Sequence, residues 1–185
     1  QVVSTSTQPK VYIRSAPADA VYIITDNNLS NAAGTALEVL GGGTFAGQGT
    51  TLTLERNNFD GSRNGVNLNG IKGPFALSHT NTFVGAGHTN GQTVAMSGLD
   101  LTVDGWSFNV ATGGIAIYVF QRSMQHLCHG CAAPSERVTI SNNTITGFTY
   151  LILGNGQKSL SVVGNRVTST STQPKVYIRS APADA

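Results

Sequence analysis

The chain has 185 residues, which is enough for a single domain with a sizeable hydrophobic core. Charged residues make up 11% and apolar residues 39%, a balance that excludes a disordered chain, because disorder combines low hydrophobicity with high net charge. The net charge of +2 gives no sign of a nucleic-acid partner, and no apolar run approaches the length of a transmembrane helix. We therefore expect one domain over residues 1–185, with no membrane span.

The first feature along the chain is a segment that occurs twice. Residues 4–20 return letter for letter at 169–185, so the apparent period is 165. Chance does not give identity over a segment of this length and mixed composition, and sequence drift would have erased it. One explanation is a cloning or permutation artefact. The other is one period, plus a short overlap, of something that repeats end to end, which requires a fold that can be extended indefinitely.

Short β-rich segments fill most of the chain, and sustained helical periodicity is absent. Five of them fit one pattern: apolar, x, apolar, x, x, Asn, x, apolar. The five are Tyr22/Ile24/Asn27/Leu29, Leu52/Leu54/Asn57/Phe59, Leu101/Val103/Trp106/Phe108, Val138/Ile140/Asn143/Ile145 and Leu160/Val162/Asn165/Val167. Each precedes a second apolar strand, at Ala36–Leu40, Val66–Leu68, Ile115–Phe120, Tyr150–Leu153 and Val176–Ile178. This succession of strand, turn, strand and longer return is typical of a solenoid.

The recurring Asn predicts a ladder of side chains along one edge of the solenoid. Asn tolerates a left-handed backbone, and its amide can bond to a neighbour above or below. We expect the ladder to contain Asn27, Asn57, Asn143 and Asn165, with Trp106 interrupting it. Alternation along the strands predicts that Leu52, Leu54, Val103, Ile140, Val162 and Ile178 point inward.

Two stretches carry a family resemblance. Leu52-Thr-Leu-Glu-Arg-Asn-Asn-Phe-Asp-Gly, continuing at Asn64-Gly-Val-Asn-Leu-Asn-Gly70, resembles the parallel β-helix repeat of the pectate-lyase-like superfamily. So does Val138-Thr-Ile-Ser-Asn-Asn-Thr-Ile-Thr-Gly. The resemblance covers most of the chain apart from two long loop insertions, near 70–98 and 121–136.

This resemblance implies an all-β chain folded as a right-handed parallel β-helix of about five rungs. The superfamily includes polysaccharide lyases, hydrolases and epimerases as well as phage tailspikes and adhesins. The resemblance therefore implies a fold and no particular activity. A two-sheet β-sandwich is the alternative, which the unequal spacing of the segments disfavours.

The densest reactive cluster lies in the second insertion. It contains His126, Cys128, His129 and Cys131. These residues are candidates for a zinc site, although four ligands in one loop would strain the tetrahedron. The Cys pair could instead close a small disulfide loop or remain as two free thiols.

The first insertion offers candidates for acid–base chemistry. Lys72 and His79 could meet Asp60 and Arg63 on one face, but none of them sits in a recognisable catalytic motif. We therefore expect neither catalytic residues nor a cofactor.

The repeated segment predicts how the chain associates. It carries one strand at both ends of the chain, and we expect this strand to form the assembly contacts: Lys10, Val11, Tyr12, Ile13 and Arg14, and Lys175, Val176, Tyr177, Ile178 and Arg179. The leading hypothesis is a non-enzymatic structural module of an extracellular or cell-surface fibre, sheath or adhesin stalk that joins head to tail to itself. The alternative is a polysaccharide-binding or polysaccharide-degrading β-helix. Its glycan groove would be lined by the aromatic residues Tyr12, Tyr22, Tyr118, Tyr150 and Trp106.

Overall fold

A computed structural model describes residues 2–4, 7–16, 20–31, 34–41, 50–59, 64–72, 81–84, 92–120, 122–123, 132–133, 135–155 and 157–179. These residues form β-strands and turns, and none of them is helical. Across the described part of the chain there is accordingly no helix with the length and apolar character needed to span a membrane.

The strands follow one another closely along the chain. Their bounds are β1 (Val2–Ser4), β2 (Val11–Ala16), β3 (Val21–Thr25), β4 (Leu29–Asn31), β5 (Thr35–Gly41), β6 (Thr50–Glu55), β7 (Asn64–Lys72), β8 (Thr82–Val84), β9 (Gln92–Gly98), β10 (Asp100–Asp104), β11 (Ser107–Val119), β12 (Arg122–Ser123), β13 (Ala132–Ala133), β14 (Ser135–Ser141), β15 (Thr144–Asn155), β16 (Gln157–Val163), β17 (Arg166–Thr168) and β18 (Val176–Arg179).

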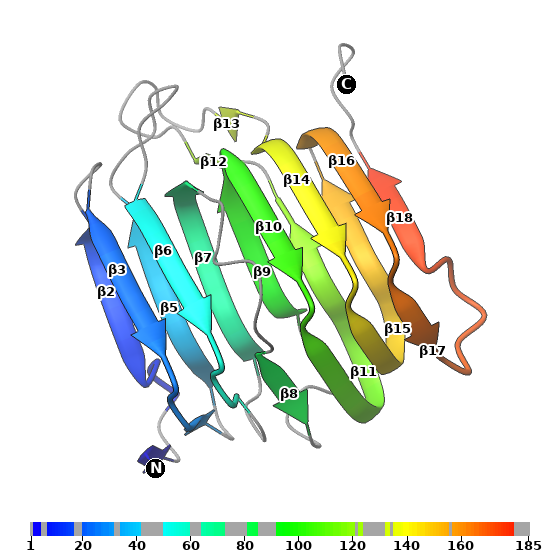
Figure 1. The fold of residues 1–185 in the computed structure, drawn as a ribbon, viewed down its shortest axis with the longest axis horizontal. Helices are drawn as coiled ribbons and strands as arrows, with labels where there is room; N and C mark the ends of the chain where they lie inside the picture. Colours follow the sequence, from blue (N-terminus) through cyan, green and yellow to red (C-terminus); the bar gives the residue numbers. More distant parts are fainter. Residues whose placement is uncertain are drawn as a thin grey trace.

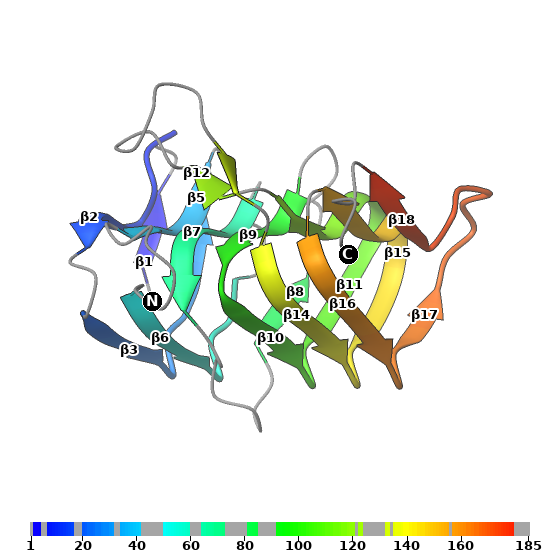
Figure 2. The ribbon, with the colours of Figure 1, turned by 90° about the horizontal axis from the view of Figure 1, so that it is seen from above.

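The strands form two facing layers that advance along the long axis of the molecule in chain order (Figure 1 and Figure 2). The front layer consists of β3, β6, β10, β14 and β16. The back layer consists of β2, β5, β7, β9, β18 and the C-terminal parts of β11 and β15. Among the described strands the chain mostly alternates between the layers as it moves from one end of the molecule to the other, and only between β7 and β9 is no front-layer strand described.

Pairing within both layers is parallel. In the back layer the order is β18-β15-β11-β9-β7-β5-β2, so each strand pairs with the one that precedes it and the one that follows it in that layer. In the front layer β3 pairs with β6, and β10 pairs with β14, which pairs with β16. Among the described strands, only β12 and β13 pair antiparallel. The expectation of an all-β chain dominated by parallel pairing is confirmed.

The core lies between the two layers, and along strands such as β6, β10 and β14 buried residues alternate with more exposed ones. Leu52, Leu54, Val103 and Ile140, all expected to point inward, are fully buried, and Val162 packs against the same cluster. Ile178 lies in the last strand of the back layer and is 48% exposed. Alternation places its side chain correctly, but no described strand follows to cover it.

The first predicted insertion contains strands. Between residues 70 and 98 the chain forms the end of β7 and all of β8 and β9, and both β7 and β9 belong to the back layer. The back layer thus has seven successive strands: the five that the pattern located, the repeated strand β2, and β9, which the pattern missed. The sequence pattern missed the repeat that contains β9 because position 78, where it requires an apolar residue, holds Ser.

Candidate functional site

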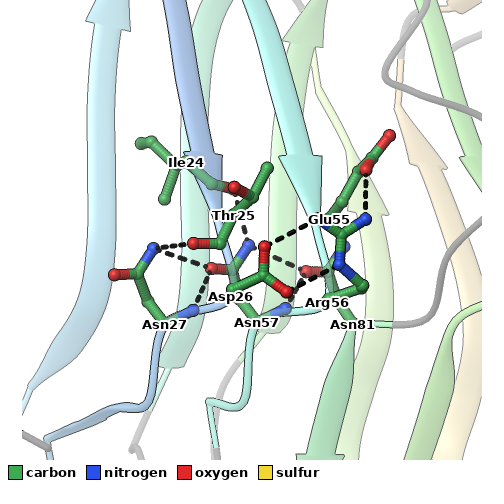
Figure 3. Close-up of polar contacts among 8 residues, drawn as sticks. All are labelled: Ile24, Thr25, Asp26, Asn27, Glu55, Arg56, Asn57 and Asn81. Carbon is green, nitrogen blue, oxygen red and sulfur yellow. Dashed lines mark hydrogen bonds and ion pairs between the residues drawn. The ribbon is translucent and has the colours of Figure 1, made fainter.

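The turn after each front-layer strand is held by asparagine side chains (Figure 3). Asn57 Oδ1 accepts hydrogen bonds from the backbone N and from Nδ2 of Asn27, both at 3.1 Å. Asn57 then donates from its own backbone N and Nδ2 to Asn81 Oδ1, at 2.9 and 3.1 Å. Its Nδ2 also reaches the carbonyl of Ile24 at 2.8 Å. Asn57 therefore links its own turn to the turns on both sides.

The same contacts recur near the other end of the molecule. Asn143 donates from its backbone N and Nδ2 to Asn165 Oδ1, at 3.0 and 2.8 Å. Asn143 Oδ1 in turn accepts from the backbone N of Trp106 at 2.8 Å. Trp106 has no side-chain amide to continue this series of hydrogen bonds. Its indole is instead buried against Phe83 and Phe108. The four expected asparagines thus lie in two hydrogen-bonded runs.

Asn81 is the ladder residue that sequence reasoning missed. It is fully buried, and its Nδ2 donates to the carbonyl of Leu54 at 2.8 Å, as Asn57 does to Ile24 one turn earlier. The signal that could have found it is Asn81-Thr-Phe83, the same Asn, x, apolar ending that the other turns have. Phe83 stacks between Phe59 and Phe108, with ring centroids at 5.0 and 4.8 Å.

The left-handed backbone falls one residue earlier than expected. The described residues with positive φ include Asp26, Arg56, Gly105, Asn142 and Gly164. Each of them immediately precedes a ladder position or Trp106. The ladder asparagines themselves are required for their amide hydrogen bonds, because a buried polar backbone must find partners. None of the four expected ladder asparagines has a positive φ, so the expectation that the ladder Asn supplies the left-handed residue is wrong, and Asn142 is an asparagine outside the ladder.

Arg56 occupies one of these left-handed positions and pairs with the turn beside it. Its guanidinium forms two hydrogen bonds to Asp26, at 2.6 Å each, and a third to Glu55 at 2.7 Å (Figure 3). Hydrogen bonding to Asp26 raises the pKa of Arg56, so its positive charge persists at every accessible pH. Because both side chains are largely exposed, this pair aligns the turns more than it stabilises the fold.

The repeated segment lies at both ends of the back layer. Strand β2 pairs with β5, and β18 pairs with β15, and among the described strands neither pairs with another on its outer edge. The large exposed apolar side chains of the described residues all belong to these strands or to the end strands of the front layer. They are Tyr12, Val21, Ile23, Val163, Val176, Tyr177 and Ile178. Both ends of the molecule therefore present a strand edge and apolar side chains that no described strand covers.

A small groove lies on the outer face of the back layer. Its volume is about 280 Å³, and it is lined by Thr35, Asn64, Val66, Asn67, Ala95, Tyr118 and Phe120. The short side chain of Ala95 leaves the hollow, and register sets it between Asn67 and Tyr118. Tyr118 stacks on Phe120 with centroids at 5.7 Å, and Asn67 donates to Glu38 at 2.8 Å. The groove is thus lined by an aromatic pair, Tyr118 and Phe120, and by the side-chain amide of Asn67.

Other predicted site residues fall outside the described residues. These are the cluster of His126, Cys128, His129 and Cys131, together with Asp60, Arg63 and His79. For Lys72 the structure describes only its place in the backbone of β7. Within the described part of the chain, no group of three or more His, Cys, Asp or Glu side chains could hold a metal ion.

Comparison with known proteins gives no relative: no family, curated protein or solved structure matches this chain. Function must therefore be argued from the geometry of the chain itself.

Proposed function

We propose that the chain is one period of a right-handed parallel β-helix, similar to those of the pectate-lyase-like superfamily, and that it acts as a non-enzymatic structural module. In this proposal the module joins head to tail with further copies to build an extracellular or cell-surface fibre, sheath or stalk. The second copy is either a separate chain or the next repeat of a longer polypeptide.

One observation carries the proposal: the row of paired residues that begins at Val11 ends at Val176, its counterpart in the repeat. The row runs through one strand after another of the back layer. Its members are Val11, Leu37, Val66, Val94, Ile117, Ile152 and Val176. One full period after Val11, the same strand sequence therefore recurs in the same layer, in the same register and on the same row of paired residues.

A second row supports the same continuity. Val2 pairs with Leu29 at one end, and Val167, which lies one full period after Val2, pairs with Ile145 at the other. The residues just before the two copies of the repeated segment thus also lie at equivalent places, each paired with an apolar residue on the inner side of its end. An arrangement whose first and last strands are interchangeable can be extended without limit, as repeat proteins are.

The acidic side chains favour a structural role. Asp26 pairs with Arg56, Asp100 with Arg137, and Glu38 accepts from Asn67. Asp104 accepts from Ser141 and Asn142, at 2.6 and 2.8 Å. These four carboxylates tie neighbouring turns or strands together, which is what a solenoid needs to keep its repeats in register.

The proposal is tested by sedimentation velocity over a wide concentration range, with electron microscopy of the same samples. We expect linear oligomers that lengthen with concentration, because open ends with unpaired strand edges and apolar side chains associate. A chain that stays monomeric at every concentration would refute self-association. The coding region gives an independent check, since a longer polypeptide would contain tandem units of the same period.

A second candidate function, polysaccharide binding, is favoured by the groove beside Tyr118. Aromatic faces pack against sugar rings, and the side-chain amide of Asn67 can bond to hydroxyl groups. Affinity electrophoresis through gels containing neutral or uronate polysaccharides would test it. We expect Tyr118→Ala to abolish any retardation, whereas Ile23→Ala, which changes an exposed side chain of the front layer, should leave it unchanged. Mobility that no polysaccharide alters would remove this candidate.

A further inference from the structure

The two ends of the molecule are stepped, and the step restricts how copies can join. The back layer extends from β2 to β18, whereas the front layer extends from β3 to β16. In the chain, β3 follows β2, but no described strand follows β18. Among the described strands, β18 therefore has no front-layer strand facing it, while β2 has β3.

We propose that neighbouring copies share one strand of the repeated segment, so that β18 of one copy and β2 of the next are alternatives for a single place in the back layer. This inference rests on the proposed head-to-tail association. In the shared joint, β3 of the next copy pairs directly with β16 and faces β18, and β5 of the next copy pairs with the outer edge of β18. Both layers then continue without a gap.

The alternative is direct stacking, in which β2 of the next copy lies on top of β18. Because β3 stays level with β2, it would then lie two strand positions from β16, and one place in the front layer would be empty. Direct stacking would also set Lys10 beside Lys175 and Arg14 beside Arg179, because identical strands pair in register. Like charges directly opposite one another disfavour that contact.

The asparagine ladder ends are complementary in the shared joint. Within each run of the ladder an asparagine donates to the Oδ1 of the following one, as Asn27 does to Asn57 and Asn143 to Asn165. The first member, Asn27, thus presents Oδ1 to the preceding copy, and the last, Asn165, presents its backbone N–H to the following copy. Sharing one strand brings these two groups into adjacent turns. Direct stacking separates them by a further strand spacing, too far for a hydrogen bond.

The same strand is covered differently at the two ends. Ile13 is half-buried and packs against the core, whereas its counterpart Ile178 is 48% exposed. Covering β18 with β3 and β5 of the next copy would give Ile178 the environment that Ile13 already has. One of the two copies of the segment is displaced in exchange, so the packing given up is nearly equal to the packing formed, as in domain swapping.

The axial repeat of the assembly distinguishes the two joints. The row from Val11 to Val176 takes six steps, so a shared joint gives a repeat of about 29 Å for a strand spacing of ~4.8 Å. Direct stacking uses all seven strands and gives about 34 Å. We expect fibre diffraction or cryo-electron microscopy of oligomers of the full chain to show the shorter repeat. The longer repeat would overturn strand sharing.

Engineered cysteines test the joint in solution. In the shared joint Ser161 of β16 lies opposite Ile23 of the next β3, about 5 Å between Cα atoms, which a disulfide can bridge. We expect the full chain with Ser161→Cys and Ile23→Cys to give a ladder of covalent oligomers, with the new bond identified by peptide mass spectrometry. The matched variant, with Tyr12→Cys and Tyr177→Cys, should not cross-link, because those residues meet only in direct stacking. The unsubstituted chain controls for bonds through Cys128 and Cys131.

The outcomes separate the two proposals. A chain without oligomers at any concentration refutes self-association itself. Oligomers that cross-link through positions 12 and 177 keep self-association and overturn strand sharing, as do oligomers that cross-link through neither pair.

A final measurement uses the variants Ile13→Asp and Ile178→Asp. Each single variant keeps one intact copy of the strand, so the protein concentration at which half of the chains are assembled should not rise. In the double variant this concentration should rise at least tenfold. Weaker assembly in both single variants would overturn sharing.

Discussion

Asn81 Oδ1 accepts two hydrogen bonds from Asn57, one from the backbone N at 2.9 Å and one from Nδ2 at 3.1 Å. One side-chain atom therefore satisfies both the backbone and the side chain of the neighbouring turn. This is why the turns can be buried: their polar groups find partners within the ladder instead of in water.

Asn81→Ala should destabilise the fold strongly. It removes the acceptor for two Asn57 donors and the donor for the Leu54 carbonyl, all in a buried turn. Buried groups left without partners cost about 1–3 kcal/mol each, so we expect a loss of about 3 kcal/mol. Urea unfolding followed by the fluorescence of the single Trp106 measures it. Asn27→Ala, in an exposed turn, is the control and should cost about 1 kcal/mol or less. Equal effects at the two positions would contradict the buried ladder.

Gly65 has no room for a side chain. A Cβ there would come within 2.4 Å of the Phe83 ring and 3.0 Å of the Thr93 carbonyl oxygen. Gly65→Ala should therefore cost about 1–3 kcal/mol, the usual range for overpacking. In a double-mutant cycle with Phe83→Leu, which withdraws the ring, the two losses should be less than additive. Additive losses would mean that the ring is not the obstacle.

Arg56 offers a direct measure of left-handed strain in the turns. Its φ is 51°, and Gly105 and Gly164 occupy the same position in other turns. Arg56→Gly relieves the backbone but loses the exposed ion pair with Asp26, so we expect a change below about 1 kcal/mol. Arg56→Ala loses the pair and keeps the strain, and should be less stable than the Gly variant by about 1 kcal/mol. Thermal unfolding of the two variants side by side checks the order, and a more stable Ala variant would contradict it.

Replacing both Cys128 and Cys131 with Ser should leave the melting temperature nearly unchanged. The surrounding sequence, rich in Gly, His and Ala, indicates a protruding loop that contributes little to the core. A collapse of folding in the double variant would point instead to a structural metal. Calorimetry with and without a chelator separates these outcomes.

The sequence determined much of this protein by itself. Alternation within short strands identified Leu52, Leu54, Val103 and Ile140 as core residues, because a strand has only two faces. The recurring Asn, x, apolar ending identified the turns, and the chemistry of the amide implied that they would bond to one another. The repeat of residues 4–20 could be seen without any structure.

Only the tertiary structure decided which strands are neighbours. The pattern did not identify the turn at Asn81 because Ser78 stands where it requires an apolar residue, and the turn is held by a buried amide and one aromatic ring. Register is a property of pairs of strands far apart in sequence, so the return of the Val11 row at Val176 emerges from a succession of pairings. The unequal burial of Ile13 and Ile178, identical in local sequence, has the same cause. Burial depends on what the rest of the chain places against a residue, and β3 follows β2 whereas none of the described strands follows β18.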